Sequence, residues 1–514
     1  MKLAIGLFGY NPGWEILLQQ EGVIYDIIED SDTDLEINDH ACLIIHNSSA
    51  IKDFAKVSDY IENGGIALFE SAKYAEIFDR KLKQKKIKYI FPAENSLFSF
   101  LGLIDFYTDF KIVKDEPENY LDKNLKIIKK AVGKGFISII PFEVNSLSAN
   151  FRSRRKRFPA DRNELPSEIV SEVSRGKIRR LIQVLLTDLF AVRELPLIQK
   201  WYYNSARESY FIFRIDTDYC ESNDALELYG ICREYSINGT WFIDTASESR
   251  IKESYARMED QEIAFHCDRH RIFQDRNTNL HYISRGLDKL EKLNISVSGY
   301  AAPFGEWNQS LADVLEEKDF SYSSEFALAY DDLPFYPYFN SKKTTVLQIP
   351  IHPISLGRLR RSHFTETEMV NYFLNLLAGK CADLQPVIIY HHPAHKHFEV
   401  IAEIFKQVRE LQLPVMNFEQ FANWWKYRNN LKITGSMTGK KIVLKSDNEY
   451  DFYLKINYRN KYCIIPFQNK LDLESLTWIE EKRIAVSGQN RKLRKLHWRD
   501  FLYNYESYKG KKRR

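Results

Sequence analysis

Two carboxylates and two imidazoles stand at the ends of short apolar runs, and these residue types suit metal-assisted hydrolysis. The run FIFRI ends in Asp216 and Asp218, which are separated by one residue. Further along, the sequence HCDRH places His266 and His270 four positions apart. One carboxylate and two imidazoles form a ligand set for a divalent ion, and the second carboxylate is left to act as a base.

These side chains need elements that bring them to one place. An apolar run that stops at acids is typical of a buried strand whose carboxyl end opens into a pocket, and in barrels and open α/β sheets that edge carries the chemistry. From residue 206 to 428, strand-like and helix-like patterns alternate, which predicts an α/β fold with a distorted (β/α)7 barrel. The expected strands are YFIFRID, GTWFID, EIAFH, VSGYAAP, FSYSS, VLQIPIH and PVIIYHH.

Two further segments complete a series of motifs along this barrel. AAPFGEWN (301–308) follows the fourth expected strand, and VIIYHH (387–392) belongs to the last. In the order RIDTD, HCDRH, AAPFGEWN and VIIYHH, the motifs resemble the polysaccharide deacetylase family, also called the NodB homology domain or carbohydrate esterase family four. The resemblance covers residues 210–427 and implies a barrel hydrolase that removes N-acyl groups.

The resemblance implies a role for each motif residue. Asp218, His266 and His270 would hold the ion, Asp216 would be the general base, and His391 would be the general acid that protonates the leaving amine. Imidazole and carboxylate ligands suit zinc, and also cobalt, nickel or iron. Such an ion lowers the pKa of its bound water from about 16 toward about 7 and polarises the amide carbonyl.

The sequence departs from the family pattern at two points. Ala301 stands where the third motif has an arginine that orients the base aspartate, and Arg214 and Arg269 are the candidates to replace it. Glu325 is the only local candidate for the acidic residue of the fourth motif. The missing arginine leaves open whether the protein turns over substrate.

Residues near the predicted strand ends are candidates to contact a substrate. Tyr219, Tyr300, Phe304 and Trp307 could stack on sugar faces, although aromatic residues are more often part of a core. We expect contacts from four residues: Pro303, Phe304, Trp307 and His392.

Other histidines allow two interpretations each. The run HHPAHKH (391–397) could hold a second metal ion, but a loop that follows a barrel strand is the preferred interpretation. His352, at another predicted strand end, either reaches the site or has a structural role.

Three functions compete on this evidence. The leading hypothesis is a metal-dependent hydrolase that removes an N-acyl group, expected to be N-acetyl, from an amino sugar or glycan precursor. An enzyme with the same barrel could instead cleave a non-sugar amide or a ureide. The third hypothesis is a catalytically impaired glycan-binding protein, in which Ala301 marks the decay of the site.

Residues 1–147 are expected to form a separate domain. The runs LAIGLFG, ACLIIHN, IALFES, KIKYIFP and GFISIIPFE alternate with helix-like segments, which predicts a doubly wound α/β layer. This layer resembles glutamine-amidotransferase-like or flavodoxin-like folds. Because Cys42 lies inside an apolar run and the turn after IALFE offers only Ser71, we expect docking or regulation here rather than catalysis.

Residues 148–205 are expected to form a helical connector. The basic run RSRRKRF predicts a solvated linker in preference to a phosphate-binding patch. A helical pattern of apolar residues then lies between Pro166 and Pro196.

Residues 431–514 are expected to form a small antiparallel β module with a disordered tail, KGKKRR. Its strand-like runs are KIVLKS, DFYLKINY, KYCIIPF and RIAVSG. The module has 20 Lys and Arg against 9 Asp and Glu, whereas the whole chain has a net charge of only +3. This excess indicates an anionic surface or glycan as partner, and no nucleic-acid motif accompanies it.

The length and composition of the whole chain limit the class of protein to which it can belong. Its 514 residues with 44% hydrophobic content predict several domains with large cores. Six scattered cysteines without a CxxC pair indicate a reducing compartment. No stretch reaches about 18 apolar residues, so we expect a soluble cytoplasmic protein without a transmembrane segment.

Overall fold

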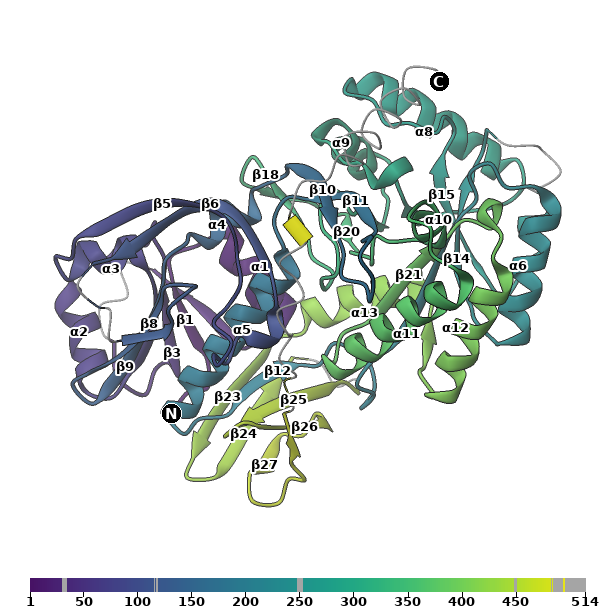
Figure 1. Cartoon of the computed structure of the whole chain (residues 1–514). Helices are drawn as coiled ribbons and strands as arrows, with labels where there is room; N and C mark the ends of the chain where they lie inside the picture. Colours follow the sequence, from purple (N-terminus) through teal and green to yellow (C-terminus); the bar gives the residue numbers. More distant parts are fainter. Residues whose placement is uncertain are drawn as a thin grey trace.

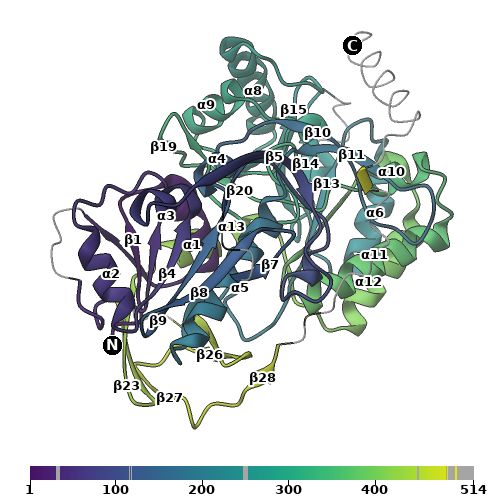
Figure 2. The ribbon, with the colours of Figure 1, turned by 60° about the vertical axis from the view of Figure 1, so that its left-hand side comes forward.

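The computed structural model describes residues 1–29, 35–114, 116, 119–246, 253–447, 451–481, 483 and 493–494. Figure 1 shows an α/β domain from the first part of the chain beside a barrel from the middle part, with a small β module below both. The turned view of Figure 2 shows the N-terminus lying next to the module. Among the described residues, no helix is long and apolar enough to cross a membrane.

The N-terminal sheet has helices on both faces. Helices α1 (Pro12–Glu21) and α5 (Arg175–Val192) pack on one face, and α2 (Phe54–Glu62) and α3 (Ser71–Ile77) pack on the other. Alternate residues of each buried strand point to the two faces, which is why two central strands are apolar apart from Glu70 at the end of one of them. The first five strands are parallel, in the order β2 (Tyr25–Ile28), β1 (Ile5–Phe8), β3 (Cys42–Ile45), β4 (Ile66–Glu70), β9 (Gly135–Ile140), β8 (Ile127–Val132) and β7 (Tyr120–Asp122).

One expected strand of this domain lies elsewhere. KIKYIFP contributes to β5 (Leu82–Ile90), which pairs with β6 (Ile104–Val113) in an antiparallel hairpin outside the sheet. The lysines of β5 are exposed, and a strand covered on both faces has no place for them. The Cys42 thiol lies fully buried in β3, and burial raises its pKa to about 12, so it is not an activated nucleophile.

The connector differs from a solvated linker. Its basic run forms β10 (Ser153–Arg157), which pairs with β11 (Ser167–Ser171). Lys156 is buried and forms an ion pair with Asp105 at 2.8 Å, and Arg494 binds the same carboxylate at 2.9 Å. The helical pattern becomes α5, which packs on the N-terminal sheet. The prediction of a solvated linker was therefore wrong, because the run forms a paired strand and a carboxylate distant in sequence buries its Lys156.

The barrel contains all seven predicted strands, which confirms the α/β barrel. They are parallel, and the last two expected strands make only one hydrogen bond across the closing edge, from His352 N to Ile388 O at 2.9 Å. A short strand, β22 (Val415–Met416), also pairs with the first. The order is β20 (Leu347–Gln348), β17 (Tyr322–Ser323), β16 (Gly299–Tyr300), β15 (Glu262–Cys267), β14 (Thr240–Asp244), β13 (Phe211–Asp216) and β21 (Val387–His391).

Helices surround this barrel and bury one apolar side against it. The capping box of Thr365 and Glu368 fixes the start of one of them, α11. Helix and strand cores merge into one cluster that includes the apolar residues of β13. The helices are α6 (Ser222–Glu234), α8 (Arg276–Glu291), α9 (Gln309–Glu317), α10 (Leu356–Arg361), α11 (Glu366–Ala382), α12 (Phe398–Glu410) and α13 (Phe418–Asn430).

The C-terminal module consists of antiparallel strands in two small sheets. One sheet has β23 (Ile433–Thr438), β24 (Lys441–Ser446) and β27 (Lys470–Asp472), and the other has β12 (Leu197–Lys200) of the connector with β25 (Tyr453–Tyr458), β26 (Lys461–Pro466) and β28 (Ile479–Glu480). The first residues of the chain bond to β23, since Leu3 N donates to Gly435 O at 2.8 Å and Met437 N donates to Met1 O at 2.9 Å. The expected strand RIAVSG and the tail KGKKRR lie outside the described residues, apart from Arg483.

Candidate metal centre

The two carboxylates of RIDTD stand at the carboxyl end of β13, between β14 and β21. Asp216 is the last residue of the strand, and Asp218 lies in the turn that follows. Thr217 fixes this turn to the neighbouring strand, because its hydroxyl donates to Phe242 O at 3.2 Å and accepts from Asp244 N at 3.0 Å. The carboxyl ends of parallel strands therefore place both acids at one edge of the barrel.

Arg214 holds Asp216 from within the same strand. Its Nε and Nη2 donate to the two carboxylate oxygens of Asp216 at 2.7 and 2.8 Å, and its Nη1 donates to Ser324 O at 2.7 Å. Residues two positions apart on a strand share a face, which allows this pairing. The Arg214 guanidinium keeps the pKa of Asp216 below its ordinary value although burial opposes this. Arg269, the other candidate, lies over the ring of Tyr282 instead.

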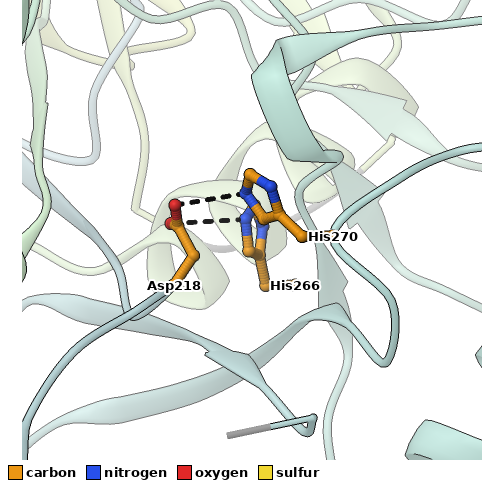
Figure 3. A group of neighbouring side chains, drawn as sticks. All are labelled: Asp218, His266 and His270. Atoms are coloured by element: carbon orange, nitrogen blue, oxygen red, sulfur yellow. Dashed lines mark ion pairs between the residues drawn. The ribbon is translucent and has the colours of Figure 1, made fainter. Parts of the chain in front are cut away.

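Asp218 faces the two histidines of HCDRH. Its oxygens lie 3.6 Å from Nε2 of His266 and 3.1 Å from Nε2 of His270, and Figure 3 shows both imidazoles turned toward the carboxylate. Ligands about 2.0–2.1 Å from a tetrahedral ion are separated by roughly 3.3 Å, so these distances suit a shared ion. His266 belongs to β15, whereas His270 lies in the loop after it.

Hydrogen bonds around these residues favour a ligand role for Asp218 over Asp216. Nδ1 of His266 lies 2.6 Å from Ala301 O, so this nitrogen carries the proton and leaves Nε2 free to coordinate. Nε2 of His266 and Oδ1 of Asp218 are buried without a hydrogen-bond partner among the described residues. Both oxygens of Asp216, by contrast, accept from Arg214. Orphaned donor atoms that converge in this way fit a divalent cation.

The loop that carries His270 is anchored by Asp268, a residue that the sequence did not single out. Its carboxylate is buried, accepts from Thr245 Oγ1 at 2.9 Å and forms ion pairs with Arg285 and Lys289 of α8. The position of Asp268 between two candidate ligands was the only sign of this role in the sequence. Its ion-pair partners lie on α8, outside the motif.

The structure brings His392, rather than His391, to the carboxylates. Nε2 of His392 lies 3.5 Å from Asp218 and 4.0 Å from Asp216. His391 pairs in register with Ile215, the residue of β13 that points away from the face of Asp216. It is fully buried, and burial lowers its pKa well below the ordinary range. His391, the expected proton donor, therefore does not face the carboxylates, and the next residue, His392, does.

Two exposed aromatic rings lie beside His270. The ring centroids of Tyr219 and Phe304 are 5.2 and 4.7 Å from that of His270, and the two residues are 54% and 49% exposed. Both have a positive φ, which is uncommon for large side chains and typical of functional loops. Of the other expected contacts, Pro303 is buried beside Phe304.

Trp307 and Tyr300 have packing roles. Trp307 stacks on Phe339 at 4.7 Å and contacts Phe151 at 5.1 Å, which joins the barrel to the connector. Tyr300 is buried in the barrel core. The structure thus does not place Trp307 beside His270.

Two further candidate residues, His352 and Glu325, bond to other groups of the protein. His352 bonds to Asp331 and Tyr372, each at 3.0–3.1 Å. Glu325 is fully buried, accepts from the backbone of Ala302 and Ser324, and burial raises its pKa to about 7. In the part of the chain that the structure describes, two groups of side chains could hold an ion, and both contain Asp218. The second joins Asp216, Asp218 and His392, so the run HHPAHKH contributes one histidine to the same centre and forms no separate site among these residues.

Of the comparisons with known proteins, the one with solved structures found matches. Neither the protein-family models nor the curated proteins match the sequence. A protein assigned as a polysaccharide deacetylase from Mycobacterium smegmatis is 18% identical, with 45% of this chain and 94% of that chain covered and a TM-score of 0.39. An allantoinase is 13% identical, with 44% and 93% covered and a TM-score of 0.37.

A family 4 pseudoenzyme from Bacillus anthracis is 11% identical, with 42% of this chain and 66% of that chain covered and a TM-score of 0.32. Apart from the allantoinase, these solved structures are described as polysaccharide deacetylases or family 4 carbohydrate esterase relatives, the family that the four sequence motifs resemble.

Proposed function

We propose that the protein is a metal-dependent hydrolase that removes an N-acyl group from an amino sugar or a glycan precursor. The observation that carries this proposal is the convergence of Asp218, His266 and His270, whose ligand atoms lie within 4.8 Å of one another beside a second, separately held carboxylate. A divalent ion held by these three residues, zinc in the first place, would activate water and polarise the acyl carbonyl.

Asp216 is the proposed general base. Its ionised carboxylate accepts two hydrogen bonds from Arg214, and a carboxylate has about four acceptor positions, so it can still take a proton from an attacking water. Arg214 supplies the orientation for which the motif arginine is missing at Ala301. This ion pair supports an active site over a decayed one.

His392 is the proposed general acid, in place of His391. Its ring lies within 4.0 Å of both carboxylates, and its side chain is 16% exposed, which leaves it accessible to a substrate in the mouth of the barrel. A histidine in this position can protonate the leaving amine as the C–N bond breaks.

Tyr219 and Phe304 support a carbohydrate substrate. Their rings flank His270 and are half exposed, so an apolar sugar face can pack against them while the acyl group reaches the metal centre. The basic C-terminal module remains a candidate contact for an anionic glycan.

Metal analysis and two matched variants test the proposal. After zinc reconstitution, the protein should hold about one ion per chain, Asp218→Asn should lose it, and Asp216→Asn should keep it but lose acetate release from N-acetylated amino sugars. Fewer than about a tenth of an ion per native chain would refute the metal centre. Turnover of ureides without turnover of sugars would instead support the amide or ureide hydrolase.

A further inference from the structure

A cavity away from the candidate metal centre lies where the N-terminal domain, the connector, the barrel and residues 493–494 meet. Its volume is about 780 Å³, inside the range of about 300–1,000 Å³ that small-molecule sites have. Neither the three proposed metal ligands nor Asp216 line it. Ligands bind preferentially in cavities between domains, so this cavity is a candidate ligand site separate from the metal centre.

One part of the wall is apolar and aromatic. The N-terminal domain contributes the loop Phe100–Leu103, the connector contributes Phe158, and α11 contributes Tyr372 and Leu376. Phe364 adds a ring at the start of α11. This wall suits the aromatic or aliphatic body of a small molecule.

The charged part of the wall has an excess of positive charge. Six basic and four acidic side chains line the cavity. One of the acids, Asp161, is exposed to solvent, and the other three already form ion pairs with basic residues of the same wall. These pairs are Arg180–Asp383 at 2.6 Å, Lys380–Asp331 at 2.8 Å and Arg162–Glu368 at 3.1 Å.

These pairs leave three basic residues of the wall, Arg157, Lys177 and Arg494, and Arg494 binds Asp105 outside the cavity. Lys177 lies in the first turn of α5. Its Nζ donates to Leu103 O at 2.9 Å, and it forms no ion pair with the residues that the structure describes. An ammonium has three donors, so two remain for a ligand. Burial lowers the pKa of Lys177 to about 8, although the carboxylates of Asp105 and Asp331 act in the opposite direction.

We propose that this cavity binds a small organic anion, with a carboxylate or phosphate group at Lys177 and an apolar body against the aromatic wall. An ammonium in a cavity wall without an ion-pair partner among the described residues is costly, and an anion would compensate it while filling the space. The site is independent of the proposed hydrolysis, since it shares no residue with the metal centre.

Two fluorescent probes with the same aromatic body test the charge requirement. The full chain should bind the anion 1-anilinonaphthalene-8-sulfonate at one saturable site, and the neutral N-phenyl-1-naphthylamine more weakly. Lys177→Gln should weaken the anionic probe at least tenfold and leave the neutral probe within twofold. Lys406→Gln, a lysine of α12 outside the cavity, is the matched control and should change neither.

A second variant keeps the test decisive if Lys177→Gln does not fold. Gly379 lines the cavity on α11, and a Cβ there would meet no atom within 4 Å. Gly379→Phe should therefore fill the space, preserve the helix and weaken both probes at least tenfold. Undiminished binding of the anionic probe to either variant overturns the proposal.

Competition identifies the anionic group. Displacement of the anionic probe by adenosine monophosphate but not by phthalate assigns a phosphate ligand, and the reverse assigns a carboxylate. Failure of both to displace it at millimolar concentration overturns the assignment to a small organic anion.

Discussion

Replacing Arg214 by methionine removes the cation that holds Asp216, and the structure sets the size of the effect. The two side chains are 0% and 4% exposed and share hydrogen bonds of 2.7 and 2.8 Å. Removing one partner of a buried ion pair costs about 3–5 kcal/mol, because the other charge stays buried and unpaired. We expect Arg214→Met to lower the free energy of unfolding by about that amount.

A double-mutant cycle separates the pair from simple packing. Asp216→Asn alone should also destabilise the protein, since it leaves the Arg214 cation without its counter-charge. The double variant contains neither charge, and we expect it to recover about 2–3 kcal/mol relative to the sum of the two losses. Urea unfolding of the metal-loaded full chain, followed by circular dichroism, measures each value.

Arg269→Met is the matched control, because Arg269 is exposed and stacks on Tyr282. It should change stability by no more than about 0.5 kcal/mol. Metal content should remain at one ion per chain in Arg214→Met, while turnover falls by about 100-fold through loss of the oriented base. Additive losses in the cycle, or full activity of Arg214→Met, would refute the idea that Arg214 replaces the arginine missing at Ala301.

Three further predictions concern residues around the site. His392→Gln should lower kcat by about 100-fold with the metal retained, whereas His391→Gln should keep turnover; acetate release and metal analysis decide between them. Phe304→Ala should raise KM by about three- to tenfold with little change in kcat, which steady-state kinetics would show. Burial raises the pKa of Glu325 from 4.5 to about 7, so the folded protein keeps a proton that the unfolded chain releases. Glu325 should therefore lower native stability as the pH rises from 4.5 to 7, by at most about 1.4 kcal/mol per pH unit. Buried Glu70 and Glu262, whose pKa values burial also raises to about 7, act in the same direction. Glu325→Gln should therefore make the pH dependence shallower and the exposed Glu291→Gln should leave it unchanged, as measured by urea unfolding at several pH values.

The strands of the barrel were predictable because each couples a short apolar run to a polar end. That pattern has a local cause, because the strand is buried and its carboxyl end opens into the site. RIDTD and HCDRH could therefore be assigned to strand ends from the sequence alone. The same reasoning predicts that a carboxylate and two imidazoles meet, whereas the choice of Asp218 over Asp216 as the ligand came from the family resemblance.

The choice between His391 and His392 could not be made in this way. Side chains alternate along a strand, so an error of one residue moves a side chain to the opposite face. Only the register of β21 against β13, in which Ile215 pairs with His391, settles which imidazole shares the face of Asp216.

Partners distant in sequence account for the other differences. Lys156 lies in a run whose charge predicts exposure, yet Asp105 in the N-terminal domain draws it into a buried ion pair. Trp307 belongs to a motif of the barrel, yet it stacks on Phe339 and contacts Phe151 of the connector. Composition and spacing carry no information on such contacts.

The bonds between the two ends of the chain have a consequence for biosynthesis. Leu3 and Met1 bond to Gly435 and Met437, and Asp105 receives Arg494. A ribosome adds about 5–20 residues per second, so the first residues wait roughly 20–90 s for the strand that covers them. During this interval the backbone groups of the first residues lack the partners that β23 later supplies, so incomplete chains expose unpaired backbone to other chains.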